Sequence, residues 1–141
     1  MVQPQPSSVV ASGHILAGRP LIPVWIRHPD DLMGAFSAAA LLDTGCVNSA
    51  VSQRLAALLG LPVVGQQQVS SPLSTVVVPT YLATIEILAS AEDGGAPAAA
   101  LHNRPLGQLA APMVGTDLVI GMDIIELGQL TMENHGWRFK L

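Results

Sequence analysis

The sequence has few charged residues, few aromatic side chains and one cysteine. Lys, Arg, Asp and Glu make up 11% of the 141 residues, Phe, Trp and Tyr make up 4%, and the formal net charge is −4. Only six residues are Lys or Arg, and they form no cluster that would neutralise phosphates, which argues against a nucleic-acid partner. Because Cys46 has no second cysteine to pair with, no oxidising compartment is implied.

Long hydrophobic runs are also missing, although half of the residues are hydrophobic. No run approaches the roughly 18 apolar residues of a membrane-spanning helix, and the first residues lack the basic and apolar regions of a secretory signal. We therefore expect a cytoplasmic protein with no membrane segment. The length suits a single domain. An apolar surplus with so few charges predicts a surface that another protein chain covers.

The residue pattern predicts a flexible tail over residues 1–13 and one domain over residues 14–141. Most of that domain has the short alternating or apolar runs of β-strands. The predicted strands are residues 21–27, 35–42, 63–69, 75–87, 118–121, 130–132 and 137–141. The alternation places Ile22, Val24 and Ile26 on one face of the first strand, and the small apolar residues of 35–42 predict a strand buried on both sides.

Two short helices complete the predicted elements. Ser52 is the expected N-cap of the first, Leu55, Leu58 and Leu59 share its buried face, and Gly60 ends it. The second is expected to begin with a capping box from Asp123 to Glu126 and to end at Gly128. Residues 89–112, rich in Ala, Gly and Pro, predict a long surface connection containing at most a ragged strand. The pattern thus predicts an all-β domain with one or two short helices.

The strongest chemical signal is Leu41-Leu42-Asp43-Thr44-Gly45. Asp-Thr-Gly alone is typical of an ordinary Asx turn, but here it follows a buried strand and leads into a helix. An ionised aspartate at the end of a buried strand is costly unless hydrogen bonds or function retain it. The same plan of strand, turn and glycine-closed helix occurs at residues 38–60 and again at 118–128, which indicates an internal pseudo-repeat.

These segments, in this order, resemble the retropepsin-like aspartic proteases. The resemblance rests on the Asp-Thr-Gly strand, a hairpin at 63–88, and Leu118-Val119-Ile120-Gly121-Met122-Asp123, and it covers roughly residues 14–141. It implies a closed β-barrel and peptide-bond hydrolysis without metal or organic cofactor. Since the chemistry needs two facing carboxylates and the chain has one Asp-Thr-Gly, it also implies a two-fold homodimer with an Asp43 from each subunit.

The resemblance implies roles for individual residues. Asp43 activates the attacking water, the Thr44 hydroxyl joins the two loops across the dimer axis, and Gly45 lets the substrate backbone approach closely. The hairpin tip at 70–75 closes over an extended peptide. The substrate-binding residues that it implies are Asn48, Ser71, Ser74, Met113 and Val119, which predicts a preference for hydrophobic residues beside the cleaved bond.

The chain departs from the family at several positions. Cys46 stands where the family usually has Ala or Ser, Met122 replaces the arginine of retroviral members, and the hairpin tip has no glycine-rich run. The four histidines show no metal-ligand spacing, and Asp117 is expected to be a surface turn residue. The covered surface is expected at residues 137–141 and at the hairpin.

Two alternatives stay open at this point. One is a catalytically silent retropepsin-like module that binds peptides or mediates dimerisation. The other is an unrelated small β-barrel in which Asp43 only makes a turn.

Overall fold

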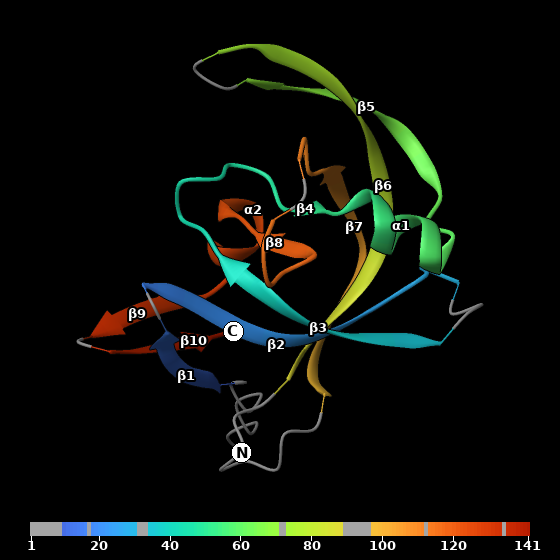
Figure 1. The fold of residues 1–141 in the computed structure, drawn as a ribbon. Coiled ribbons are helices and arrows are strands. Elements are labelled where there is room, and N and C mark those ends of the chain that lie inside the picture. The colour runs from blue at the N-terminus through green and yellow to red at the C-terminus, as the bar shows by residue number, and fades with distance from the viewer. Residues whose placement is uncertain are drawn as a thin grey trace, which may run out of the picture.

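A computed structural model describes residues 10–16, 18–30, 34–70, 73–88, 97–111, 113–133 and 135–141. Figure 1 shows how the chain runs through its helices and strands. The elements are β1 (Val10–Leu16), β2 (Arg19–Arg27), β3 (Ala35–Leu42), β4 (Ala50–Val51), α1 (Gln53–Leu59), β5 (Val63–Ser70), β6 (Thr75–Leu88), β7 (Pro97–Gln108), β8 (Leu118–Ile120), α2 (Met122–Ile125), β9 (Gln129–Glu133) and β10 (Gly136–Lys140). None of the helices in these ranges is long and apolar enough to cross a membrane.

The strands form a mixed sheet that closes on itself. Their order is β5-β6-β7-β4-β8-β3-β2-β1-β10-β9, and a further pairing of β6 with β2 closes six of them into a barrel. β3 pairs with β8 in parallel, and so does β4 with β7, whereas the other pairs are antiparallel. The structure confirms the predicted all-β class with a closed barrel and two short helices.

The barrel interior is built from alternating apolar positions, because successive side chains of a strand point to opposite faces. Ile22, Val24 and Ile26 of β2 are fully buried, as the alternation predicts, and they meet Ile85 and Ile87 of β6. β3 has the predicted bounds, but only its second half enters the core. The prediction that this strand is buried along both faces is therefore wrong for its first residues, which lie outside the closed part of the barrel.

Helix α1 has the predicted caps. The Ser52 side chain accepts a hydrogen bond from the Leu55 N–H, and Gly60 adopts the left-handed conformation, at φ 60°, that ends the helix. Leu55 and Leu59 are buried, whereas Leu58 is 54% exposed, which corrects its predicted place on the buried face. The helix has only seven residues, so its narrow buried stripe does not reach Leu58.

Three predicted boundaries differ from the structure. Residues 10–13, assigned to the tail, belong to β1, which pairs with β10; residues 1–9 lie outside the described ranges. In residues 89–112, expected to be a surface connection, the described part contains β7, a twelve-residue strand between β6 and β4. Helix α2 begins at Met122 with Gly121 as N-cap and no side-chain cap, so the predicted capping box is absent.

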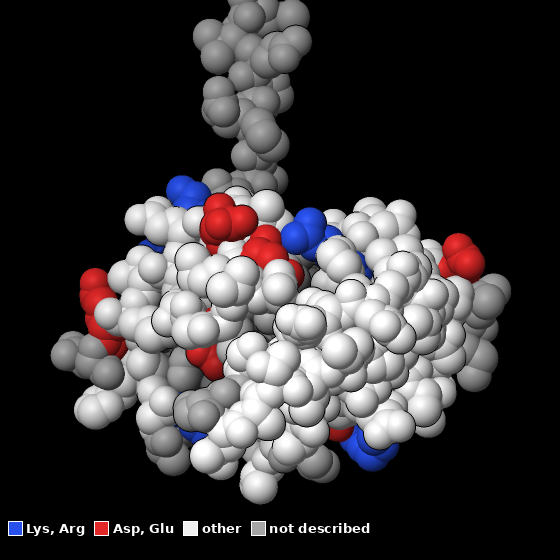
Figure 2. Space-filling model, turned by 90° about the horizontal axis from the view of Figure 1, so that it is seen from above, with Lys and Arg blue, Asp and Glu red and all other residues white. Residues whose placement is uncertain are grey.

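The hairpin of β5 and β6 has the predicted position and extends from the barrel. In Figure 1 it arches over the side of the molecule where the loop after β3, α2 and β9 lie. Residues 63–85 contain no Lys, Arg, Asp or Glu. Seen from above, most of the visible face carries none of these side chains (Figure 2). The hairpin thus presents an uncharged surface.

Candidate active site

Asp43 lies directly after β3, where the chain leaves the barrel in a tight turn. One carboxylate oxygen, Oδ1, accepts a hydrogen bond from the Gly45 N–H at 2.9 Å, and the Cys46 N–H donates to the Asp43 carbonyl at 3.2 Å. The Asp43 N–H donates to the carbonyl of Ile120 at 2.9 Å, which extends the parallel pairing of β3 and β8 by one residue. These bonds hold the half-buried carboxylate at the mouth of the barrel, with Thr44 and Gly45 exposed beside it.

The second carboxylate oxygen of Asp43 is contacted by the thiol of Cys46. The Cys46 Sγ donates to Oδ2 at 3.2 Å. Burial, the hydrogen bond to Asp43 and the negative charge of Asp43 raise the pKa of Cys46 from 9.0 to about 11. The thiol therefore stays protonated at neutral pH and acts as a donor to the carboxylate.

The start of α2 docks onto the loop that follows Asp43. The Met122 N–H donates to the Cys46 carbonyl at 2.7 Å and the Asp123 N–H to the Val47 carbonyl at 3.0 Å. Gly121 makes this approach possible, because a Cβ there would lie 2.8 Å from the backbone of both Cys46 and Asn48. The second half of the pseudo-repeat therefore braces the loop of the first half.

A buried serine ties the same loop to α2, and sequence reasoning missed it. Ser49 is fully buried, and both its hydroxyl and its N–H donate to Asp123 Oδ1, at 2.7 and 3.0 Å. The Gly121 N–H in turn donates to the Ser49 hydroxyl at 2.9 Å. The predicted cap residue Asp123 thus anchors the loop that follows Asp43. The only local sequence signal is a serine placed directly before the short buried strand β4.

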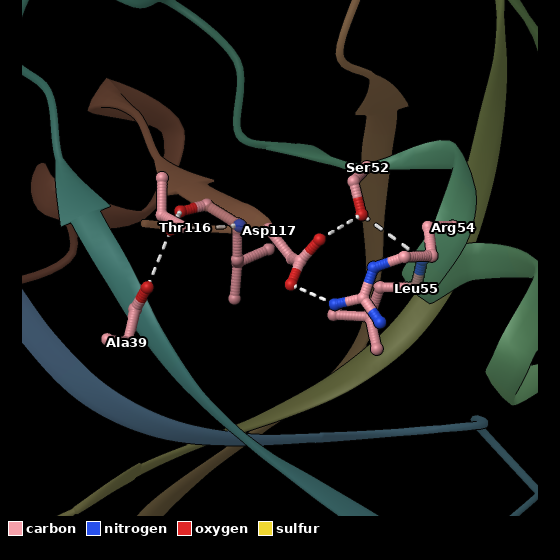
Figure 3. A network of polar contacts seen from close by, with 7 residues as sticks. Ala39, Ser52, Arg54, Leu55, Thr116 and Asp117 are labelled. Atoms are coloured by element: carbon pink, nitrogen blue, oxygen red, sulfur yellow. Dashed lines mark hydrogen bonds and ion pairs between the residues drawn. The ribbon is translucent and has the colours of Figure 1, made fainter. Parts of the chain in front are cut away.

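A second polar network joins α1 to the start of β8 (Figure 3). The Ser52 hydroxyl donates to one carboxylate oxygen of Asp117 at 2.7 Å, and Arg54 pairs with the other. These contacts, chiefly the hydrogen bond from Ser52, hold the pKa of Asp117 below 3.8. Asp117 lies in the bend before β8, in line with the predicted turn, but its partly exposed carboxylate also joins α1 to that strand. Next to it, the Thr116 hydroxyl donates to the Ala39 carbonyl of β3 at 2.6 Å.

The predicted substrate-binding residues lie in different settings. Asn48 is exposed on the loop after Asp43, and Ser74 is exposed at the hairpin tip, whereas Ser71 lies outside the described residues. Met113 is half-buried in a turn closed by its bridge to Thr116. Val119 is only 2% exposed, because β8 runs between β3 and β4. Contact of these residues with a substrate stays a prediction.

Thr44 lines an apolar hollow of about 450 Å³ beside the Asp43 loop. Its wall is formed by α2 and β9. Its apolar lining side chains are Met122, Ile125, Leu130 and Met132, and Glu126 also lines it. Within the described ranges, no three His, Cys, Asp or Glu side chains are grouped so as to hold a metal ion. The site therefore consists of one hydrogen-bonded carboxylate on a braced loop, next to an apolar surface.

Comparison with solved structures gives a likeness that covers almost the whole chain. No family model and no curated protein sequence matches the chain. Among solved structures, it is similar to a retropepsin-like aspartic protease from Rickettsia conorii, with a TM-score of 0.62 over 98% of this chain and 97% of the other, at 12% sequence identity. The chain therefore has the fold of the retropepsin-like aspartic proteases.

Proposed function

We propose that the chain is an aspartic endopeptidase that acts as a homodimer, with one active site made from the Asp43 of each subunit. The observation that carries this proposal is the position of Asp43. Within a retropepsin-like fold, it follows β3 and is held by the Gly45 N–H at the mouth of the barrel. The loop that carries Asp43 is also held by α2 and Ser49, which fixes the position of the carboxylate.

In the proposed dimer the two carboxylates share one proton, because like charges about 3 Å apart do not both ionise. The ionised Asp43 acts as general base and takes a proton from a water molecule between the carboxylates, and this water attacks the peptide carbonyl. The protonated Asp43 donates to the carbonyl oxygen and stabilises the tetrahedral intermediate. The pair then returns a proton to the leaving amine, which breaks the C–N bond. Because the pair titrates as a unit, activity is confined to a pH band.

In the proposed enzyme, an extended peptide binds between this loop and the hairpin of β5 and β6. The inner face of the hairpin offers apolar side chains, since Val69 and Val76 are directly opposite each other and share a face with Val78. These side chains and the uncharged hairpin favour hydrophobic residues beside the cleaved bond. We assign to Ser74 and Asn48, which are exposed at the hairpin tip and on the loop after Asp43, the role of binding the peptide backbone.

The test compares Asp43→Asn with the wild type on a peptide library, with products identified by mass spectrometry from acidic to neutral pH. We expect the variant to lose at least about 10²–10⁴-fold in kcat/KM, the usual contribution of general acid–base catalysis. Asp30→Asn is the matched control, because its side chain is 77% exposed and lies outside this loop. Equal cleavage by Asp43→Asn would contradict the mechanism. A dimer that cleaves no peptide would instead favour a silent binding module.

A further inference from the structure

The six Lys and Arg side chains of the chain fall into two groups. Two of them, Arg138 and Lys140, make no ion pair or side-chain hydrogen bond with any residue that the structure describes. These two charges are therefore available to a partner. The other four contact oxygen atoms of the chain itself: Arg27 pairs with Glu86, Arg54 pairs with Asp117, Arg19 donates to the Val114 carbonyl, and Arg104 donates to the Asp123 carbonyl.

Both of these cations project from the same face of β10. Side chains alternate along a strand, so Trp137 and Phe139 point into the core and are 3% and 1% exposed, whereas Arg138 and Lys140 are exposed on the outer face. The strand is also paired on both edges, with β1 and β9. The sequence-based expectation of an apolar covered surface at residues 137–141 is therefore wrong. What β10 offers to a partner is positive charge.

Polar side chains of the two neighbouring strands share this outer face. Thr131 of β9 and Ser12 of β1 are both opposite Arg138, and Gln129 of β9 is opposite Lys140. All three are exposed. A hollow of about 280 Å³ is lined by Gln129, Thr131, Arg138 and Lys140, with no acidic side chain in its lining. The hollow thus combines two positive charges with a hydroxyl and an amide that can donate hydrogen bonds.

Two titratable side chains lie at the other end of the same face. Glu133 of β9 and His14 of β1 are both opposite Gly136. Glu133 lines a neighbouring hollow of about 470 Å³ that also reaches Arg138. Lys140 stands at the far end of β10 from Gly136. The negative charge of Glu133 therefore confines an acidic partner to the end of the sheet that carries Lys140.

We propose that the outer face of β10 is a docking surface for an acidic segment of another protein, which lies extended along the strand and pairs alternate carboxylates with Arg138 and Lys140. The two cations are two residues apart on a strand, so their Cα atoms are about 6.6 Å apart. Alternate residues of an extended segment have the same spacing, so two carboxylates of such a segment meet both cations at once. This inference concerns a partner and does not depend on catalysis at Asp43.

The net charge of the chain does not prevent this contact. It is −4, but at physiological ionic strength charges more than about 8–10 Å away are largely screened. The side chains within reach of the segment, chiefly Arg138 and Lys140, therefore decide its affinity. β1, β9 and β10 lie away from the hairpin of β5 and β6 (Figure 1), so a segment bound there leaves the hairpin free.

Fluorescence anisotropy with a labelled hexaglutamate peptide tests the proposal at low salt. The full chain carries Asp43→Asn, so that no cleavage consumes the probe. We expect Arg138→Gln and Lys140→Gln each to raise the dissociation constant about 2–5-fold, the usual contribution of an exposed ion pair. Arg54→Gln is the matched control, because it changes the net charge equally and is 66% exposed on α1. It should leave the dissociation constant unchanged, and a hexaglutamine probe should not bind.

Three results would overturn the docking surface: no binding of hexaglutamate, an equal loss of affinity in Arg54→Gln and Arg138→Gln, or displacement of the probe by inorganic phosphate at an equal concentration of anions. The last result would indicate a site for a compact anion. Circular dichroism verifies that the variants are folded.

The outcomes also separate this inference from the proposed function. Peptide cleavage by the wild type without hexaglutamate binding overturns the docking surface and leaves the protease. The expected binding pattern together with equal cleavage by wild type and Asp43→Asn supports the docking surface and refutes the protease mechanism.

Discussion

The thiol of Cys46 provides a direct probe of the contacts around Asp43, because it is the only thiol in the chain. Its pKa is raised from 9.0 to about 11, first by burial and then by the hydrogen bond and charge of Asp43. At pH 9 the thiolate fraction is then about 1% in the folded protein and about half in the unfolded chain, and only the thiolate attacks a disulfide reagent.

The expected difference in reaction rate is smaller than the difference between these two thiolate fractions. A thiolate of higher pKa is a better nucleophile, by about 6–10-fold for two pKa units at a Brønsted slope of 0.4–0.5. Folded protein should therefore react with an aromatic disulfide about 5–8-fold more slowly at pH 9 than urea-unfolded protein. The logarithm of its rate should keep rising past pH 9, and level off near pH 11.

Asp43→Asn identifies the cause of the shift. Because this change removes the negative charge but leaves the burial, the midpoint of the rate profile should fall below that of the wild type and stay above 9.0. If burial alone raised the pKa of Cys46, the two proteins would have identical pH–rate profiles. If the thiol were exposed and had no contact with Asp43, the midpoint of the wild-type profile would lie near 9.0. Either result would refute the geometry around Asp43. The raised pKa also means that the stability conferred by this contact is present below pH 9 and lost as the pH rises through 11.

Two further changes test the packing that supports the site. Ser52→Ala removes the N-cap of α1 and should lower the free energy of unfolding by about 1 kcal/mol at pH 7 in urea titrations, relative to the exposed control Ser12→Ala. The same change removes the hydrogen bond that is the main cause of the lowered pKa of Asp117. In the wild type, the lowered pKa stabilises the fold above pH 3.8, and this stabilisation is lost as the pH falls below 3.8. The free energy of unfolding of the variant should therefore decrease less on acidification than that of the wild type. Gly107→Ala should displace the Gln67 side chain, because that side chain occupies the space of the new Cβ. The hairpin should then be more sensitive to limited proteolysis. Gly65→Ala is the control, because no atom lies within 4 Å of a Cβ at that position, and it should not change the proteolysis. Unchanged acid sensitivity of Ser52→Ala, or equal proteolysis of the two glycine variants, would contradict these contacts.

Local patterns predict the elements whose stability depends on neighbouring residues in the chain. The N-cap at Ser52 and the left-handed Gly60 are properties of a few adjacent residues, and both are found as predicted. The alternation in β2 and the two hairpins are also where the sequence places them. Asp43 at the end of an apolar strand belongs to the same group, because its turn is closed by its own neighbours Gly45 and Cys46.

β7 shows why other elements escape local reasoning. Its residues include Pro105, Gly107 and several alanines, which are poor strand formers. The strand also has an irregular register against β6 and a residue, Asn103, at φ 52°. It is a strand because β6 and β4 supply partners on both sides. That pairing is a tertiary effect, and it overrides local preference.

The amino-acid sequence by itself determined the class of fold, the caps of α1 and the aspartate at the end of β3, because each depends on residues close together in the chain. Only the tertiary structure decided which residues brace that aspartate and which edge is left open. Ser49 and Asp123 are 74 residues apart, and they meet only because β3 and β8 pair in parallel. Among the described strands, β10 is paired on both sides, with β1 and β9, whereas β9 is paired only with β10, an arrangement that no local pattern encodes.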